Sequence, residues 1–439
     1  MNKIFQALIT LLFFGVPSRV LPQELQTIVE ELGSIHTTIR NDSCSNQQVI
    51  SNRAMNLFLS DKIGTYLSGY KDLSFYKNNV SFNAASGEFS LNHNMFQAKG
   101  LDNPVRSVST VGVKANVTNA IASAFTDQTF TNQLGMTITT AWIQKPKTTL
   151  NSCAEKNMMD AQRETLLELI KQETAKRDDE FAKILAALRQ GSHSDADFAK
   201  MKLALKQEYF EAVKDEVSRK FAQTQYLELA RSMRYKKITT NWTSVSVYLP
   251  IILERFLVAN SIHEPTKNQK LYPFEFALRH TRLYETKSFG RIFLKLEANL
   301  SFSGVQNQQA LNKMNLKDYI DAGGADSFPL RQRSIKTVYV GKYETFLTPA
   351  ITAGFVYFPP NSHIGVSSFI EQNIGKYSAL NWTLGIPVVL INTIGAPAAN
   401  FEFKIRYFDI SHSVYPGRSF KENISVNFSV GVPFSKIIY

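Results

Sequence analysis

The most restrictive feature of this sequence is a strict alternation close to its end. Over residues 422–434, apolar side chains occupy every second position, and small or polar side chains occupy most of the positions between them. The apolar stripe consists of Ile424, Val426, Phe428, Val430, Val432 and Phe434. A period of two puts these residues on one face of a β-strand. The segment therefore predicts a strand whose two faces meet very different surroundings.

The same alternation recurs along most of the chain, and we expect about thirteen strands in all. Besides the last one, the predicted strands are residues 73–83, 88–96, 106–117, 134–143, 238–249, 272–279, 292–302, 336–344, 351–358, 364–370, 380–390 and 401–407. The polar stretch 306–333 predicts a long loop. Single-chain bacterial barrels usually have an even number of strands, so twelve or fourteen is the expected count for a barrel.

A change of period divides the chain. Apolar residues at helical spacing predict helices over residues 24–40 and 47–66, and two long helices over residues 154–190 and 195–233. Ser194 is placed to cap the last of these helices. We expect a signal peptide (1–22), a helical segment (23–70), barrel strands (71–150), a helical hairpin (151–235) and further barrel strands (236–439).

The first residues have the three-part pattern of a secretory signal peptide. Lys3 is followed by an apolar core over residues 4–16 and then by polar residues. This pattern favours export over the alternative of a buried N-terminal helix. Beyond residue 22 no run of about 18 apolar residues occurs, so we expect no membrane-spanning helix.

The sequence contains no recognisable catalytic or metal-binding pattern. Seven histidines are present, but none belongs to a Gly-x-Ser-x-Gly or His-Glu-x-x-His arrangement, so we expect no enzyme, cofactor or metal. The net charge is +12, yet the basic residues are scattered among acids, which argues against nucleic acid and favours anionic lipid headgroups. Cys44 and Cys153 could pair after export or remain two thiols, and the sequence leaves both open.

The strands in which full charges alternate with large apolar residues decide the expected fold. In residues 401–407, Phe, Phe, Ile and Tyr alternate with Glu402, Lys404 and Arg406. With so many aromatic-rich strands in an exported chain, we expect a mainly β fold: a closed antiparallel transmembrane barrel of about 12–14 strands with an inserted helical hairpin. The lumen-lining candidates are Glu275, Arg279, Lys295, Glu297, Glu402, Lys404 and Arg406, as a selective site or as a mutually paired interior.

Two segments carry a resemblance to a known class of proteins. Gly431-Val432-Pro433-Phe434 and Leu384-Gly385-Ile386-Pro387-Val388, within their alternating strands, resemble the bacterial outer-membrane β-barrel proteins. The resemblance covers the general pattern of residues 72–439 outside the hairpin. It implies an outer-membrane location and a C-terminal strand that the barrel-assembly machinery recognises by a terminal aromatic. One departure is that Phe434 fits the alternation, but the chain continues to Tyr439.

Three functions are compatible with this pattern. The first is a channel or transporter for small polar solutes. The second is a barrel that anchors the helical hairpin, which would bind a protein partner in the cell envelope. The third is a secreted, soluble all-β protein with a helical arm. The hairpin would contact the partner in the second case and buttress the barrel in the first.

Overall fold

The structure is a computed structural model in which part of the chain is described. The described residues are 50–64, 79–83, 88–94, 105–116, 125–126, 129–130, 134–150, 155–191, 194–232, 235–251, 254–261, 264–271, 274–302, 312–320, 331–341, 347–375, 378–391, 397–414 and 423–433. The expected signal peptide, the expected helix over residues 24–40, and both cysteines lie outside these residues.

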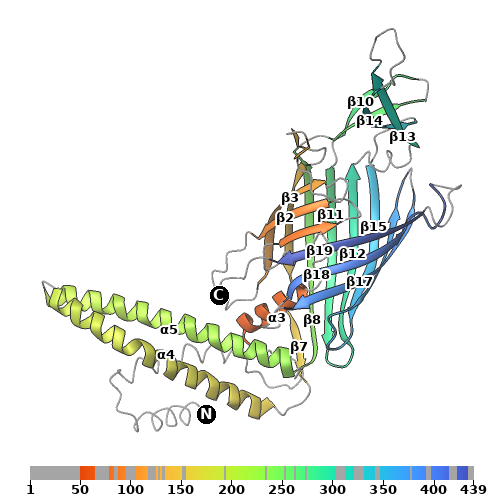
Figure 1. Ribbon diagram of the computed structural model, residues 1–439. Helices are drawn as coiled ribbons and strands as arrows, with labels where there is room; N and C mark the ends of the chain where they lie inside the picture. The colour runs from red at the N-terminus through yellow and green to blue at the C-terminus, as the bar shows by residue number, and fades with distance from the viewer. Residues whose placement is uncertain are drawn as a thin grey trace.

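Twelve antiparallel strands form a closed barrel (Figure 1). In spatial order they are β11 (Phe274–Thr286), β12 (Gly290–Phe302), β15 (Leu347–Phe358), β16 (Val366–Asn373), β17 (Leu380–Ile391), β18 (Pro397–Tyr407), β19 (Ile424–Pro433), β1 (Asn79–Asn83), β2 (Glu88–Asn94), β3 (Ser107–Asn116), β6 (Leu134–Ile143) and β8 (Tyr235–Pro250). Pairing of β8 with β11 closes the ring. The last strand pairs with the first, Phe82 opposite Val430.

One of the thirteen predicted strands belongs elsewhere, which leaves twelve in the barrel, one of the two strand numbers expected. Residues 336–344 overlap β14 (Arg331–Val340), which lies in a separate four-stranded sheet with β9 (Glu254–Ala259), β10 (Lys267–Leu271) and β13 (Asn312–Ile320). The predicted loop over residues 306–333 is also wrong, because it contains β13. This sheet is built from the connections β8–β11 and β12–β15, and β14 pairs in parallel with β9. Strands β4 (Phe125–Thr126) and β5 (Thr129–Phe130) form a small further pair.

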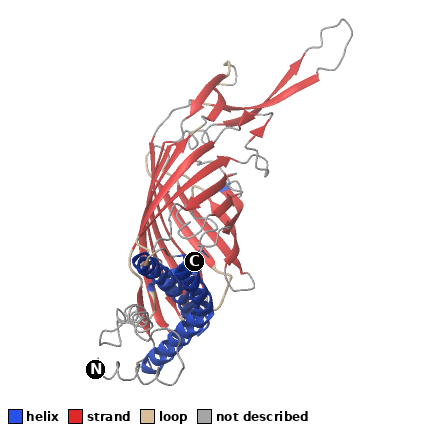
Figure 2. Ribbon diagram, turned by 90° about the vertical axis from the view of Figure 1, so that its left-hand side faces the viewer, coloured by secondary structure: helices blue, strands red, loops and turns tan. Residues whose placement is uncertain are grey.

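The two ends of the barrel differ in their connections. At one end β11 turns into β12 through residues 287–289, and residues 359–365 and 392–396 link the next pairs. At the other end the connections 251–273 and 303–346 carry the four-stranded sheet. We call these the short-turn end and the long-loop end. Figure 2 shows the helices gathered at the end opposite the long loops.

Three helices are described: α3 (Asn52–Gly64), α4 (Glu155–Gly191) and α5 (Asp195–Ser232). None of them is long and apolar enough to cross a membrane. Helices α4 and α5 form the predicted hairpin and leave the barrel at the short-turn end, between β7 (Lys147–Leu150) and β8 (Figure 1). Strand β7 continues the line of β6 along β8 after an interruption at residues 144–146.

The hairpin is held by a short apolar seam at its barrel-proximal half. Leu166 and Ile170 of α4 pack with Val213, Val217 and Phe221 of α5. At the turn, Ser194 caps α5 as predicted, since its hydroxyl accepts a hydrogen bond of 3.1 Å from the backbone N–H of Asp197. The distal half is looser, because Ile184 and Met201 are exposed there.

An ionic cluster lies beside the apolar seam. The buried carboxylate of Glu173 on α4 accepts hydrogen bonds from Lys220 on α5 and, at 3.0 Å, from Lys176. Burial alone would raise the pKa of Glu173, but the two lysines outweigh it and hold the pKa below its ordinary value of 4.5. Because the folded pKa is the lower one, the stabilisation is present above pH 4.5 and is lost as the pH falls through the folded pKa.

We expect Glu173→Gln to loosen the hairpin at pH 7 and to remove this acid dependence. Amide hydrogen exchange in α4 and α5 of the full chain, corrected for intrinsic rates, should be about two- to fivefold faster in the variant at pH 7. Below the lowered pKa, wild type and variant should converge. Glu180→Gln, at an exposed position on the same helix, is the control. Equal exchange rates in wild type, Glu173→Gln and Glu180→Gln at pH 7 would show that Glu173 does not stabilise the hairpin.

Candidate functional site

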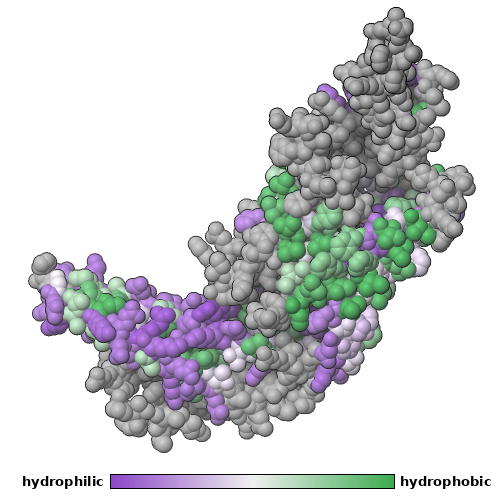
Figure 3. Space-filling model, in the orientation of Figure 1, coloured by the Kyte–Doolittle hydropathy of each residue, from purple (hydrophilic) through white to green (hydrophobic). Residues whose placement is uncertain are grey.

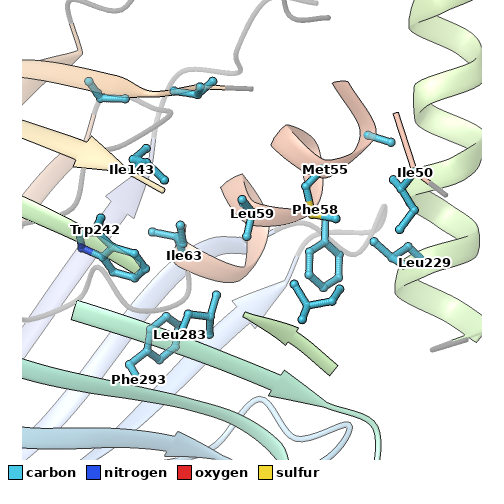
Figure 4. Packing of buried hydrophobic residues seen from close by; sticks show 14 of the residues in the cluster. Ile50, Met55, Phe58, Leu59, Ile63, Ile143, Leu229, Trp242, Leu283 and Phe293 are labelled. Atoms are coloured by element: carbon cyan, nitrogen blue, oxygen red, sulfur yellow. The ribbon is translucent and has the colours of Figure 1, made fainter. Parts of the chain in front are cut away.

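Helix α3 lies at the short-turn end with its apolar side chains buried against the barrel wall. Met55, Phe58, Leu59 and Ile63 are at most 1% exposed. They belong to one cluster with inward-facing wall residues of β8, β11, β12 and β15: Ile238, Trp242, Leu283, Phe293, Val356 and Phe358. Figure 4 shows Trp242, Leu283 and Phe293 beside α3. Every α3 side chain with a described exposure is buried or half-buried. The helix therefore fills the barrel at this end, and we call it the plug.

The plug carries polar residues that a buried helix must satisfy. The guanidinium of Arg53 is buried and donates hydrogen bonds to Asp215 at 3.0 Å and to Ser218 at 3.4 Å, both on α5. The backbone N–H of Ser51, just before the plug, donates to Gln225 of α5 at 3.1 Å. These contacts join the plug to the hairpin.

A second polar contact joins the plug to the wall. Lys62 of the plug forms an ion pair of 3.4 Å with Glu285, the last inward-facing residue of β11. The same carboxylate accepts hydrogen bonds from Tyr235 of β8 at 3.1 Å and from Arg291 of β12 at 2.7 Å. Glu285 is thus shared by the plug and two wall strands, and one carboxylate balances two cations there.

Further along β11 and β12, three of the sequence candidates meet. Glu297 forms ion pairs with Arg279 at 3.2 Å and with Lys295 at 2.8 Å. Arg279 also donates to Ser246 of β8 at 2.6 Å. Their neighbours Leu278 and Leu296 are 45% and 55% exposed, so the charged residues occupy the opposite, inward face. Glu275 lies on that same face of β11, four positions before Arg279.

The other three candidates lie together on β18. Glu402 is fully buried, pairs with Lys404 at 2.9 Å, and accepts a hydrogen bond of 2.7 Å from Ser367 of β16. Arg406 pairs at 2.8 Å with Glu371 of β16, which also accepts from Asn381 of β17 at 2.9 Å. The candidates thus form two separate clusters on different strands, not one site.

Sequence reasoning missed Glu285, Arg291 and Glu371 as inward-facing partners. Glu371 follows directly after the predicted strand 364–370, and one more residue of alternation would have included it. Glu285 was missed because the predicted strand ended at Arg279, where the pattern reverses. On β11, Arg282 is exposed, whereas Leu283 points inward to the plug.

Among the described residues, no group of three or more His, Cys, Asp or Glu side chains has the arrangement of a metal site. The polar interior instead consists of acids and bases in contact, with serine, threonine and asparagine on the neighbouring inward positions. Such a surface interacts with water and polar solutes through hydrogen bonds and local charge.

Comparisons with known proteins give low similarities. No family model and no curated protein matches the chain. The beta domain of the Bordetella autotransporter BrkA is 7% identical, with 82% of this chain and 97% of that chain covered and a TM-score of 0.26. The CymD monoaromatic hydrocarbon channel is 8% identical over 92% and 97%, with a TM-score of 0.25. OmpT of Vibrio cholerae without loop L8 is 9% identical over 81% and 95%, with a TM-score of 0.24.

Because these TM-scores are low, the fold of the chain is assigned from its own strand pairing. That pairing forms a ring of twelve antiparallel strands, and the ring is closed at both β1–β19 and β8–β11. The chain is therefore a closed β-barrel with a helical insertion, and its inner face is polar except where the plug lies.

Proposed function

We propose that this chain is an outer-membrane barrel that acts as a channel or transporter for small polar solutes, closed at its short-turn end by the plug. The proposal rests on the two parts of the inner face. Ion pairs line the wall toward the long-loop end, and the plug packs on apolar residues at the short-turn end. A polar lumen that a separate helix fills at one end is the arrangement expected of a channel in its closed state.

The outer face supports placement in a membrane. Large apolar side chains alternate outward around the barrel and make the apolar band visible in Figure 3. They include Leu91, Val113, Ile138, Leu278, Leu296, Ile351, Ile370, Leu384, Ile386, Phe403, Ile405 and Val426. Water would penalise so large an exposed apolar surface, whereas lipid tails would not. The band makes a soluble secreted protein the least favoured of the three candidates.

The connections support one orientation. Outer-membrane barrels have short turns on the periplasmic side and longer loops outside the cell. With that rule, the plug and the hairpin lie in the periplasm, and the four-stranded sheet lies outside. The chain would reach this place by the expected signal peptide and the barrel-assembly machinery, and outer-membrane lipid would be its surroundings.

The anchor function remains the second candidate because of one feature of the hairpin. Its distal half exposes Ile184, Met201 and Leu203, and Leu203 is 69% exposed. Figure 3 shows this apolar patch near the far end of the hairpin. Exposed apolar patches of this kind mark binding surfaces. An envelope protein that contacts the patch would make the hairpin the working part of the molecule.

The membrane assignment predicts different costs for arginine at two exposed leucines. Leu296→Arg on β12 should lower the free energy of unfolding in lipid by about 2–4 kcal/mol, since it places a charge in hydrocarbon. Leu203→Arg on the hairpin should change it by less than about 0.5 kcal/mol, because water already surrounds that position. Denaturant titration in lipid vesicles measures both. Equal, small effects would count against the membrane and for the soluble alternative.

The channel assignment predicts that deleting the plug opens the pore. Refolded wild-type protein should conduct little in planar bilayers, and a variant lacking residues 52–64 should conduct steadily. Heat-modifiable migration in gels checks that the variant barrel is folded. A folded, plug-deleted barrel that carries no current would mean that polar side chains alone seal the lumen, which would favour the anchor function.

A further inference from the structure

The plug is held by two parts of the molecule with different chemistry. The barrel wall contributes apolar packing and the ion pair of Lys62 with Glu285. Helix α5 contributes residues at spacings of three and four, which form one stripe along a helix: Asp215, Ser218, Ala222, Gln225 and Leu229. We call this the latch stripe. It lies beside the stripe of Val213, Val217 and Phe221 that faces α4.

The latch stripe holds the plug by polar contacts beside the apolar contacts of Ala222 and Leu229, and one of the polar contacts is partly exposed to solvent. The side chain of Asp215 is 70% exposed, while that of Arg53 is 5% exposed. When an ion pair of this kind separates, water replaces the lost hydrogen bonds of the exposed partner. Separating this contact therefore costs less than separating the close apolar packing of α3 against Trp242 and Phe293.

The hairpin extends well beyond the plug. Helix α5 has 38 residues, about 57 Å at 1.5 Å per residue, and the latch stripe occupies its barrel-proximal half. A load on the distal half acts through this rigid helix on the residues that contact Arg53 and Ser51. Any tilt of α5 away from the barrel therefore separates the latch stripe from the plug.

We propose that the hairpin gates the barrel: α5 holds the plug in the closed position through the latch stripe, and displacement of the hairpin removes this hold and shifts the plug toward an open state. This inference rests on the proposed channel function and assigns its regulation. The hairpin is then neither a passive buttress nor an independent binding arm. Its position determines whether the short-turn end is open.

Conductance of full-length variants in planar bilayers tests the proposal. Asp215→Asn and Arg53→Asp each weaken the latch, and each should raise the fraction of time spent open by about tenfold over wild type. The double variant Arg53→Asp with Asp215→Arg restores opposite charges and should return conduction to near the wild-type level. Glu208→Gln, an acid-to-amide change at an exposed position of α5 outside the latch stripe, is the matched control and should not open the pore.

The outcomes separate the two proposals. If the plug-deleted barrel conducts and both latch variants remain as closed as wild type, the latch is wrong and the channel function stands. If the plug-deleted barrel is folded but does not conduct, the channel function fails and the gating proposal fails with it. Opening by Arg53→Asp without rescue in the double variant would indicate damage to the plug rather than loss of a latch, and would overturn the proposal.

Discussion

Closure of the backbone hydrogen-bond ladder is the constraint on which the rest of the structure depends. A strand with an unpaired edge leaves N–H and C=O groups without partners, which is costly wherever water is absent. The chain meets this constraint by pairing its first and last strands, Asn79 opposite Pro433, and by pairing β8 with both β6 and β11. Strands far apart in the sequence must therefore pair with each other before all their backbone hydrogen bonds can form.

Closure also creates an interior that the sequence has to fill. Twelve strands enclose more space than the eight-stranded barrels that wall side chains alone can fill. Two kinds of side chain fill this interior at different positions along the barrel. Beyond the plug, ion pairs such as Arg279 with Glu297 and Lys404 with Glu402 occupy the wall, and around the plug Leu283, Phe293 and Val356 turn the wall apolar.

The same division explains how much could be predicted from the sequence. Strands with an apolar outer face and a polar inner face were recognisable, as were the long helices of the hairpin and the cap at Ser194. Alternation fails where both faces are apolar or where its polarity reverses, as it does at Arg282 and Leu283. A local pattern also cannot tell which sheet a strand joins, so β14 was placed in the barrel. Contacts such as Arg53 with Asp215 join residues 162 positions apart, and no local signal marks them.

The interrupted strand β6–β7 has a mechanical consequence for the hairpin. Because β7 stays paired with β8 after the break, Lys147 opposite Thr239, the hairpin is attached through two neighbouring strands and not through two separate linkers. At these positions β8 is also paired on its other side with β11, Thr239 opposite Tyr284, so the strands that carry the hairpin are part of the barrel wall. The base of the hairpin is thereby fixed to the wall, and any movement of the hairpin relative to the barrel has to begin beyond these paired strands.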